Sequence, residues 1–317
     1  MKAVIMAGGQ GTRIKSITKD EIPKTMLKVG NKTILEYQID CLKKAEIDEI
    51  IIVVGHLKEL IKDYFKDGEG YGIKISYYEE INPLGTGGSL YYLKDYIKDD
   101  FVFLYGDIFL NVNLNNMIKY HKRNKSDVTI LVQPTSHAYD VDLVVLNDDK
   151  VINYIHKGPK EDYINLGNSG IFCFSPRIFD YIKENQIQDV ERDIISKMFQ
   201  NTNVYAYKTH EYLKDMGTVD RYNELINDFK KGITNNKKKV FIFDINDIMF
   251  NDKFFKKIKK LNQSKYLCIC TYDYMNDYTR KKIDTTLGNK GLYIDIYCMK
   301  DKLDSLIKSL KKEDYHE

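Results

Sequence analysis

The sequence has no long hydrophobic run. Its longest aliphatic stretch, at 50–54, is far shorter than the roughly 18 residues of a membrane span. Hydrophobic residues make up 43% of the 317 residues and charged residues 30%, a composition that can form a core and argues against disorder. The N-terminus runs straight into a glycine loop, so we expect no signal peptide. Composition excludes membrane, secreted, fibrous and disordered classes, and the length predicts about two domains.

Cysteine is scarce and its spacing is irregular. The five cysteines form no C-x-x-C pair, and a structural zinc site needs paired ligands at such spacing. We expect them to be small buried hydrophobes in a protein of the reducing cytoplasm. They are Cys41, Cys173, Cys268, Cys270 and Cys298.

Arginine is also scarce. Lysine and arginine exceed acidic residues by only 49 − 46 = 3, and the six arginines are scattered along the chain. Arginine is the usual reader of nucleic-acid phosphates and guanines. We therefore expect neither nucleic acid nor a membrane as a partner.

The first half of the chain alternates strand and helix patterns. Aliphatic runs bounded by glycine and separated by helical periodicity predict βαβ units on a mostly parallel sheet. Strands are expected at 2–6, 49–54, 73–77 and 101–104, and helices at 33–44, 57–65 and 89–97.

The pattern changes near residue 128. Closely spaced short strands then predict an antiparallel addition to the sheet. They are expected at 128–132, 141–146, 151–155, 169–174 and 203–207. The polar segment KKGITNNKKK at 230–239 is the best candidate for a linker.

An α/β alternation restarts beyond this segment. It predicts strands at 240–243, 266–270 and 292–297, with helices near 254–261, 278–287 and 302–310. The expected domains are therefore residues 1–232 and a small α/β unit within 233–317.

The loop after the first predicted strand carries the strongest chemical signal. It reads GGQGTR at 8–13, with Ile22-Pro23-Lys24 following. The sequence fits neither the dinucleotide fingerprint nor the Walker A pattern. Backbone N–H groups of such a loop can cradle phosphates, and the nearby arginine and lysine can bind a triphosphate and the oxyanions of a leaving pyrophosphate.

This motif and several others, in order, resemble the sugar-1-phosphate nucleotidyltransferase family. The similarity covers about residues 1–230 and is greatest to the heptose 1-phosphate guanylyltransferase branch, which is related to mannose-1-phosphate guanylyltransferases. The further motifs are LEYQ at 35–38, VVGHL at 53–57, EEINPLGTGG at 79–88, YGD at 105–107 and KDMGTVDRY at 214–222. The resemblance implies a Rossmann-like, mostly parallel mixed sheet of the nucleotide-diphospho-sugar transferase type.

The resemblance also implies roles for charged residues. Arg13 and Lys24 would bind the triphosphate and stabilise the charge that develops at the α-phosphorus. Asp107 and Asp215 would hold Mg²⁺, a hard cation that takes one or two protein carboxylates together with phosphates and water.

Nucleotide binding is expected at two loops. The glycine loop contributes Gly8, Gly9, Gly11 and Thr12, and the second loop contributes Glu80, Gly85 and Thr86. An ionised glutamate only accepts hydrogen bonds, and guanine offers two adjacent donors, so Glu80 favours GTP, with CTP second. An alternative is that Glu80 is solvated and the backbone at 85–88 reads the base.

The acceptor side departs from the family. By resemblance, Lys157 would bind the sugar phosphate, and Asn168 and Gly106 would line its pocket. His156 stands where the family has a glutamate that binds sugar hydroxyls, so the acceptor sugar is open. This change prompts an alternative, a CTP-dependent cytidylyltransferase acting on a small polyol phosphate.

The resemblance implies in-line displacement without a protein nucleophile. A sugar 1-phosphate of heptose or mannose type attacks a nucleoside triphosphate and pyrophosphate leaves, giving a precursor of surface polysaccharide. The partners would be a nucleoside triphosphate and a sugar phosphate, and a homo-oligomer is open. A different class of function, a non-catalytic regulatory subunit that binds nucleotide sugars, would not need the reacting groups kept.

The segment VFIFDINDI at 240–248 resembles the first motif of haloacid-dehalogenase-type phosphatases. Asp244 takes the place of the nucleophile, and Thr271 resembles the hydroxyl of the second motif. Asn246 replaces the acid that acts as proton donor and acceptor, and an amide cannot exchange a proton at neutral pH. Ile248 replaces a threonine. The departures predict a shortened, inactive phosphatase-like domain with a role in packing or oligomerisation, the alternative being an active phosphatase.

Overall fold

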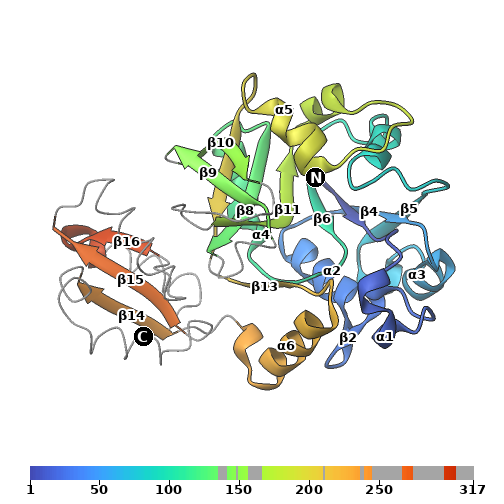
Figure 1. The fold of residues 1–317 in the computed structure, drawn as a ribbon, viewed down its shortest axis with the longest axis horizontal. Helices are drawn as coiled ribbons and strands as arrows, with labels where there is room; N and C mark the ends of the chain where they lie inside the picture. The colour runs from blue at the N-terminus through green and yellow to red at the C-terminus, as the bar shows by residue number, and fades with distance from the viewer. Residues whose placement is uncertain are drawn as a thin grey trace.

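The computed structural model describes residues 1–134, 141–147, 149–155, 166–209, 211–235, 239–244, 266–273 and 296–304. A nine-stranded sheet dominates this part of the chain, in the order β5-β4-β1-β6-β11-β8-β12-β10-β9 (Figure 1). Its strands are β1 (Lys2–Met6), β4 (Glu49–Val54), β5 (Lys74–Glu79), β6 (Phe101–Tyr105), β8 (Val128–Pro134), β9 (Leu143–Asn147), β10 (Lys150–Ile155), β11 (Leu166–Phe174) and β12 (Val204–Lys208).

The sheet is evenly mixed rather than mostly parallel. Strands β5, β4, β1 and β6 are parallel to one another, as βαβ units require. β11 then runs antiparallel to both β6 and β8, β12 is parallel to β8, and β10 is antiparallel to both β12 and β9. The antiparallel addition is confirmed, and it supplies half of the neighbouring pairs.

The strand order changes direction around β1. The chain passes from β1 to β4 and β5 on one side, and then returns to β6 on the other side of β1. The connections diverge there, and open α/β sheets bind ligands beyond the carboxyl ends of strands at such a point.

Helices cover both faces of the sheet. The α-helices are α1 (Lys15–Thr18), α2 (Ile34–Lys44), α3 (Lys58–Phe65), α4 (Leu114–Arg123), α5 (Ser196–Met198) and α6 (Val219–Lys230). The 3-10 helices are η1 (Thr12–Ile14), η2 (Lys24–Met26), η3 (Glu69–Tyr71), η4 (Gly88–Leu93), η5 (Pro176–Tyr181), η7 (Ile233–Asn235) and η9 (Lys300–Lys302), and η6 (Val190–Ile195) is a π-helix.

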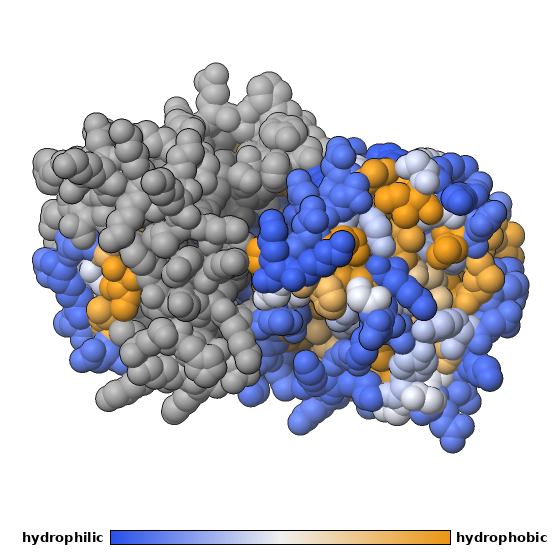
Figure 2. Space-filling model, turned by 90° about the horizontal axis from the view of Figure 1, so that it is seen from below, coloured by the Kyte–Doolittle hydropathy of each residue, from blue (hydrophilic) through white to orange (hydrophobic). Residues whose placement is uncertain are grey.

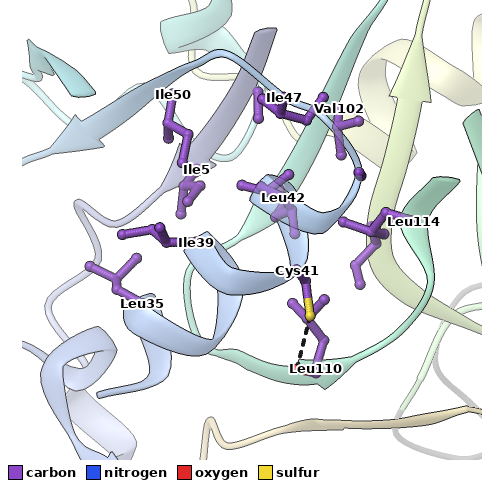
Figure 3. Close-up of a cluster of buried hydrophobic side chains, with 14 of the residues drawn as sticks. Ile5, Leu35, Ile39, Cys41, Leu42, Ile47, Ile50, Val102, Leu110 and Leu114 are labelled. Carbon is purple, nitrogen blue, oxygen red and sulfur yellow. Dashed lines mark hydrogen bonds between the residues drawn. The ribbon is translucent and has the colours of Figure 1, made fainter. Parts of the chain in front are cut away.

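The core follows from the alternation of side chains along each strand. In β1, Ala3 and Ile5 face one cluster with α2, α3 and α4, whereas Val4 faces the other, with η4, η5 and η6. Figure 3 shows Ile39 and Leu42 of α2 directed toward β1, the strand that carries Ile5. Both faces of the parallel half are therefore buried, as its nearly continuous aliphatic runs predict.

Local signals set the start of α2. The Thr33 hydroxyl accepts a hydrogen bond from the Glu36 backbone N–H at 3.2 Å, and the Glu36 carboxylate accepts one from the Thr33 N–H at 2.6 Å. This capping box satisfies two otherwise unpaired donors, so the helix begins where its periodicity predicts. Near its other end the Cys41 thiol donates to the Leu110 carbonyl oxygen (Figure 3).

Most expected elements are present, with one clear correction. The helix expected at 89–97 is instead the shorter 3-10 helix η4, which starts at Gly88. Glycine, serine and tyrosine are poor helix formers, and this segment contains all three types. The predicted burial of cysteine is confirmed for Cys41, Cys173 and Cys270.

Two short ribbons complete the N-terminal part. β2 (Lys28–Val29) pairs with β3 (Lys32–Thr33), and β7 (Ile108–Asn111) pairs antiparallel with β13 (Tyr212–Asp215). Ile233 and Thr234 are buried, and Ile233 packs in the same cluster as residues of α6, so this packing reaches beyond residue 232. The boundary at 232 stays a prediction.

A second sheet follows, of three parallel strands in the order β14-β15-β16. They are β14 (Lys239–Asp244), β15 (Tyr266–Tyr272) and β16 (Ile296–Met299), drawn in orange to red in Figure 1. The strands expected at 240–243 and 266–270 are thus confirmed. The strand expected at 292–297 overlaps β16 only at 296–297, and residues 292–295 lie outside the described residues. The helices expected at 254–261 and 278–287 lie outside the described residues, and of the one at 302–310 only the first residues are described.

The described helices include none long and apolar enough to cross a membrane. On the face drawn in Figure 2, hydrophilic residues are interspersed with smaller apolar areas.

Candidate active site

The loops that follow the parallel strands meet at one edge of the large sheet. Gly8 follows β1, Gly55 follows β4, Glu80 follows β5 and Asp107 follows β6. Parallel strands bring their carboxyl ends together, so these loops become neighbours because of the topology.

The glycine loop lies between Glu80 and Lys24. A Cβ at Gly8 would lie 3.1 Å from Glu80 Oε2, and one at Gly9 would lie 3.6 Å from Lys24 Nζ. Gly11 has φ +63°, in the left-handed region that favours glycine. Thr12 follows it, exposed, in the short helix η1.

Lys24 and Asp107 form an ion pair across the site. Lys24 Nζ donates to Asp107 Oδ2 at 2.6 Å, and the two side chains are 19% and 16% exposed. Both side chains are partly shielded from bulk water, and this shielding strengthens their electrostatic effect on any charge placed beside them. Each side chain remains partly exposed.

Asp215 is brought beside Asp107 by the β7–β13 ribbon. In this ribbon Asp215 pairs with Ile108, the residue after Asp107. The next residue, Met216, donates its N–H to the Asp107 carbonyl oxygen at 3.0 Å. Asp107, in the turn just before β7, and Asp215, at the end of β13, are thus brought close together although they are far apart in sequence.

Two arginines surround Asp215. Its Oδ1 accepts the Gly217 N–H at 2.6 Å, and its Oδ2 accepts a hydrogen bond from Arg221 Nη1. A Cβ at Gly217 would lie 2.9 Å from Asp215 Oδ1 and 3.1 Å from Arg13 Nη2. The structure therefore gathers Arg13, Lys24, Asp107 and Asp215 around one place.

Hydrogen bonds from within the protein hold one oxygen of the Glu80 carboxylate. Its Oε1 accepts hydrogen bonds from the Leu84 N–H at 2.9 Å and from the hydroxyl of Ser89, which is fully buried. Its Oε2 lies toward Gly8. The carboxylate is thus oriented with one oxygen toward the glycine loop.

The second loop is anchored to the segment before η6. A Cβ at Gly85 would lie 2.5 Å from the Gln188 carbonyl oxygen. The Thr86 hydroxyl accepts the Val190 N–H at 2.9 Å and donates to Asp189 Oδ2 at 3.3 Å. The structure gives this hydroxyl partners within the protein.

The residues expected on the acceptor side divide into two groups. Gly106 is buried and donates its N–H to the Met6 carbonyl oxygen at 2.9 Å, which holds the Asp107 loop against β1. Asn168 lies half-buried in β11 and donates to Glu191 Oε1 at 2.8 Å. Lys157 and His156 lie outside the described residues.

Three polar residues near the site were not expected from the sequence. Glu191 is only 7% exposed, and Tyr105 donates to its Oε2 at 2.6 Å. Burial raises the pKa of Glu191 to about 8, and nearby Asp189 adds to the increase. The third residue is Arg221, which belongs to the motif at 214–222; for Glu191, no motif marked the position.

The two carboxylates at the site suit a divalent cation whose other ligands are phosphate oxygens. Among the described residues no group of three or more His, Cys, Asp and Glu could hold a metal ion. Carboxylates such as those of Asp107 and Asp215 are hard oxygen donors, and Mg²⁺ bound with substrate phosphates needs only one or two of them.

The second sheet also carries charged residues at a carboxyl edge. Lys300 pairs with Asp244 at 2.8 Å and with Asp273 at 2.6 Å, and both carboxylates raise the pKa of Lys300. The Thr271 hydroxyl donates to the Phe243 carbonyl oxygen at 3.2 Å. Asn246 and Ile248 lie outside the described residues.

Comparisons with known proteins agree on the N-terminal part. The family described as Nucleotidyl transferase matches residues 2–232. A D-glycero-alpha-D-manno-heptose 1-phosphate guanylyltransferase from Campylobacter jejuni is 34% identical over 230 residues, which are 72% of this chain and 100% of that protein. A UTP–glucose-1-phosphate uridylyltransferase from Synechocystis is 31% identical over 71% of this chain but only 62% of that protein, so the chain spans less than two thirds of this relative.

Solved structures agree as well. HddC from Yersinia pseudotuberculosis complexed with GMP-PN has a TM-score of 0.61 and 25% identity, with coverage of 72% of this chain and 99% of that chain.

Proposed function

Since the chain belongs to the nucleotidyl transferase family, we propose that it joins a nucleoside monophosphate from a nucleoside triphosphate to a sugar 1-phosphate and releases pyrophosphate. The observation that carries the proposal is the meeting of Asp107, Asp215, Lys24 and Arg13 at one sheet edge. Phosphoryl chemistry needs positive charge beside the reacting phosphates and acids for a cation, and this edge offers both.

The protein acts by positioning and electrostatics. The glycine loop would receive the triphosphate, with Arg13 and Lys24 donating hydrogen bonds to its oxygens. These fixed positive charges stabilise the negative charge that grows as the acceptor phosphate oxygen bonds to the α-phosphorus and the bond to pyrophosphate breaks. No side chain needs to form a covalent bond.

Asp107 and Asp215 would hold Mg²⁺. When bound, this ion neutralises phosphate charge. Asp107 pairs with Lys24 and Asp215 pairs with Arg221, which restricts the conformations of both carboxylates.

GTP is the favoured donor. Glu80 has one oxygen held by the protein and one toward the glycine loop, which suits a carboxylate that accepts from the adjacent N–H groups of guanine. The Campylobacter relative is named a guanylyltransferase and the HddC structure is a complex with GMP-PN, which supports the same choice.

A heptose or mannose 1-phosphate is the proposed acceptor, with Asn168 donating to it and accepting from it. Lys157 would bind its phosphate. The product would serve the synthesis of surface polysaccharide.

A substrate panel tests the proposal. Pyrophosphate release is measured with Mg²⁺ and each of five nucleotides, combined with heptose, mannose and glucose 1-phosphates and small polyol phosphates. We expect turnover with GTP and a sugar 1-phosphate. Turnover only with CTP and a polyol phosphate would favour the cytidylyltransferase alternative, and no turnover with any pair would contradict the proposal.

The C-terminal sheet is proposed to have no part in this reaction. Its role would be packing or oligomerisation in a phosphatase-like domain that has lost its proton donor.

A further inference from the structure

Glu191 is a buried acid that the proposed reaction does not use. It lies in the π-helix η6 and is 7% exposed. Burying an acid is unfavourable unless its oxygens are hydrogen-bonded, and π-helical turns are frequent at functional sites. The contacts of this carboxyl group therefore call for an explanation.

Both oxygens of Glu191 have partners from other elements. Tyr105, the last residue of β6, donates its hydroxyl to Oε2 at 2.6 Å, and Asn168 of β11 donates its side-chain N–H to Oε1 at 2.8 Å. Because both oxygens are engaged and the side chain is buried, Glu191 does not itself contact a substrate.

The contacts close into a ring. Asn168 Oδ1 accepts the Gly170 N–H at 3.0 Å. Gly170 has φ +69°, and a Cβ there would lie only 2.6 Å from Tyr105 Cδ2, so the tyrosine ring packs directly on this glycine. The orientation of Asn168 and that of Tyr105 are thus set together, through Glu191 on one side and Gly170 on the other.

The ring of contacts links the turn that bears Asp107 to strand β11, which bears Asn168. Tyr105 directly precedes Gly106 and Asp107, and the β8–β11 register is irregular between Asn168 and Phe172. Such irregularities redirect side chains beside active sites. One carboxyl group therefore ties the loop that bears Asp107 to the strand that bears the proposed acceptor ligand.

We propose that Glu191 is a positioning residue that presets the Asn168 amide and the Tyr105 ring for binding of the acceptor sugar 1-phosphate. This inference rests on the proposed function, from which the role of Asn168 comes. A preset amide lowers the entropy lost on binding, so the contribution of Glu191 is expected in acceptor affinity rather than in nucleotide affinity.

The ionisable groups around Glu191 come from several elements. Tyr105 lies on β6, Asp189 caps η6, and Tyr154 of β10 is close enough for Glu191 to raise its pKa. The pKa of Glu191 itself is raised to about 8, so it is neutral at pH 7 and glutamine is its isosteric mimic.

The test compares Glu191→Leu, Glu191→Gln and Tyr105→Phe with the wild-type chain. Glu191→Leu leaves both partners without a hydrogen bond, so we expect the acceptor KM to rise at least tenfold while the GTP KM changes less than twofold. Glu191→Gln keeps one bond to each partner and should restore the acceptor KM to within threefold. Tyr105→Phe should give an intermediate increase.

Glu184→Leu is the matched control. Glu184 accepts a hydrogen bond from the Tyr91 hydroxyl at 3.1 Å on the exposed surface, so this variant removes a similar pair away from the site. Both KM values should stay at their wild-type levels.

The failures of the two proposals differ. A wild-type chain without turnover for any substrate pair overturns the proposed function and this inference together. An active wild type whose Glu191→Leu variant shows an unchanged acceptor KM, or equal increases in both KM values, overturns the positioning role alone. If Glu191→Leu does not fold, Tyr105→Phe decides in the same way: an unchanged acceptor KM, or equal increases in both KM values, overturns the positioning role.

Discussion

Each of the two larger sheets in this chain has a lysine paired with aspartate near the carboxyl ends of parallel strands. In the large sheet Lys24 pairs with Asp107, and both side chains are less than one-fifth exposed. In the three-stranded sheet Lys300 pairs with Asp244 and Asp273, but Lys300 is 43% and Asp273 is 73% exposed. The same charged pair is shielded from water at one edge and open to it at the other.

The difference shows what a charged edge needs in order to become a reaction site. At the large sheet, a glycine loop, a second acid on β13 and two arginines converge on the pair. Charges act more strongly where water is partly excluded, and an arrangement that is already organised costs nothing to assemble during the reaction. A lysine–aspartate pair alone does not indicate an active site.

Removing the acids should give the largest contrast between the two edges. Asp107→Asn and Asp215→Asn each keep the side-chain shape but remove a charge proposed to hold Mg²⁺, so kcat/KM should fall at least about 100-fold. The rate of pyrophosphate release is measured at saturating Mg²⁺. Asp244→Asn is the control and should stay within twofold of wild type. Near-normal rates for both Asp107→Asn and Asp215→Asn would contradict the metal assignment.

Removing the lysines should give the next contrast. Lys24→Met removes a positive charge beside the reacting phosphates but leaves Arg13 in place, so we expect kcat to fall roughly 30-fold, less than the roughly 100- to 1,000-fold cost of losing an oxyanion-hole donor. Lys300→Met should leave it unchanged. Equal losses for the two variants would mean that the second edge takes part in the reaction.

Glu80→Gln should have a smaller and more selective effect. A glutamine presents one acceptor where the carboxylate presents two, so the preference for GTP over CTP should fall about tenfold, as for a lost hydrogen bond to a charged group. The measurement is the ratio of kcat/KM for the two nucleotides. An unchanged ratio would favour base reading by the backbone at 85–88.

A pH titration of stability distinguishes the buried acid from the exposed pair. The folded-state pKa of Glu191 is raised above its unfolded value, so its neutral form stabilises the fold below about pH 4.5 and this stability is lost as pH rises through about 8. One proton contributes a slope of at most about 1.4 kcal/mol per pH unit to the free energy of unfolding. Glu191→Gln should flatten this slope in urea unfolding, whereas Lys300→Gln should not. A wild-type stability that is flat from pH 5 to 8 would contradict the burial argument.

The smallest effect is expected from removing the second sheet. A chain that ends at Asn235 keeps the packing of Ile233 and Thr234, so its turnover should stay within twofold of the full chain. Sedimentation of both chains shows whether the second sheet affects oligomeric state. A large loss of turnover would show that the second sheet contributes to the site.

The parts of the site that could be predicted are those encoded in short segments. The glycine loop, Lys24, Glu80 and Asp107 each follow a strand or turn whose pattern is visible within a few residues. The helix predicted at 89–97 was wrong: this segment contains weak helix formers and folds instead as the shorter 3-10 helix η4. The even mixture of strand directions was also missed, because strand pairing is not a local property.

Short stretches of sequence were enough to predict the parallel strands, the glycine loop and the two acids, because each is encoded by residues close together in the chain. The position of Asp215 beside Asp107, and the contacts of Glu191 with Tyr105 and Asn168, are visible only in the folded chain. The physical reason is that pairing between distant strands is set by how both faces of the sheet bury their side chains, and burial is a property of the whole fold.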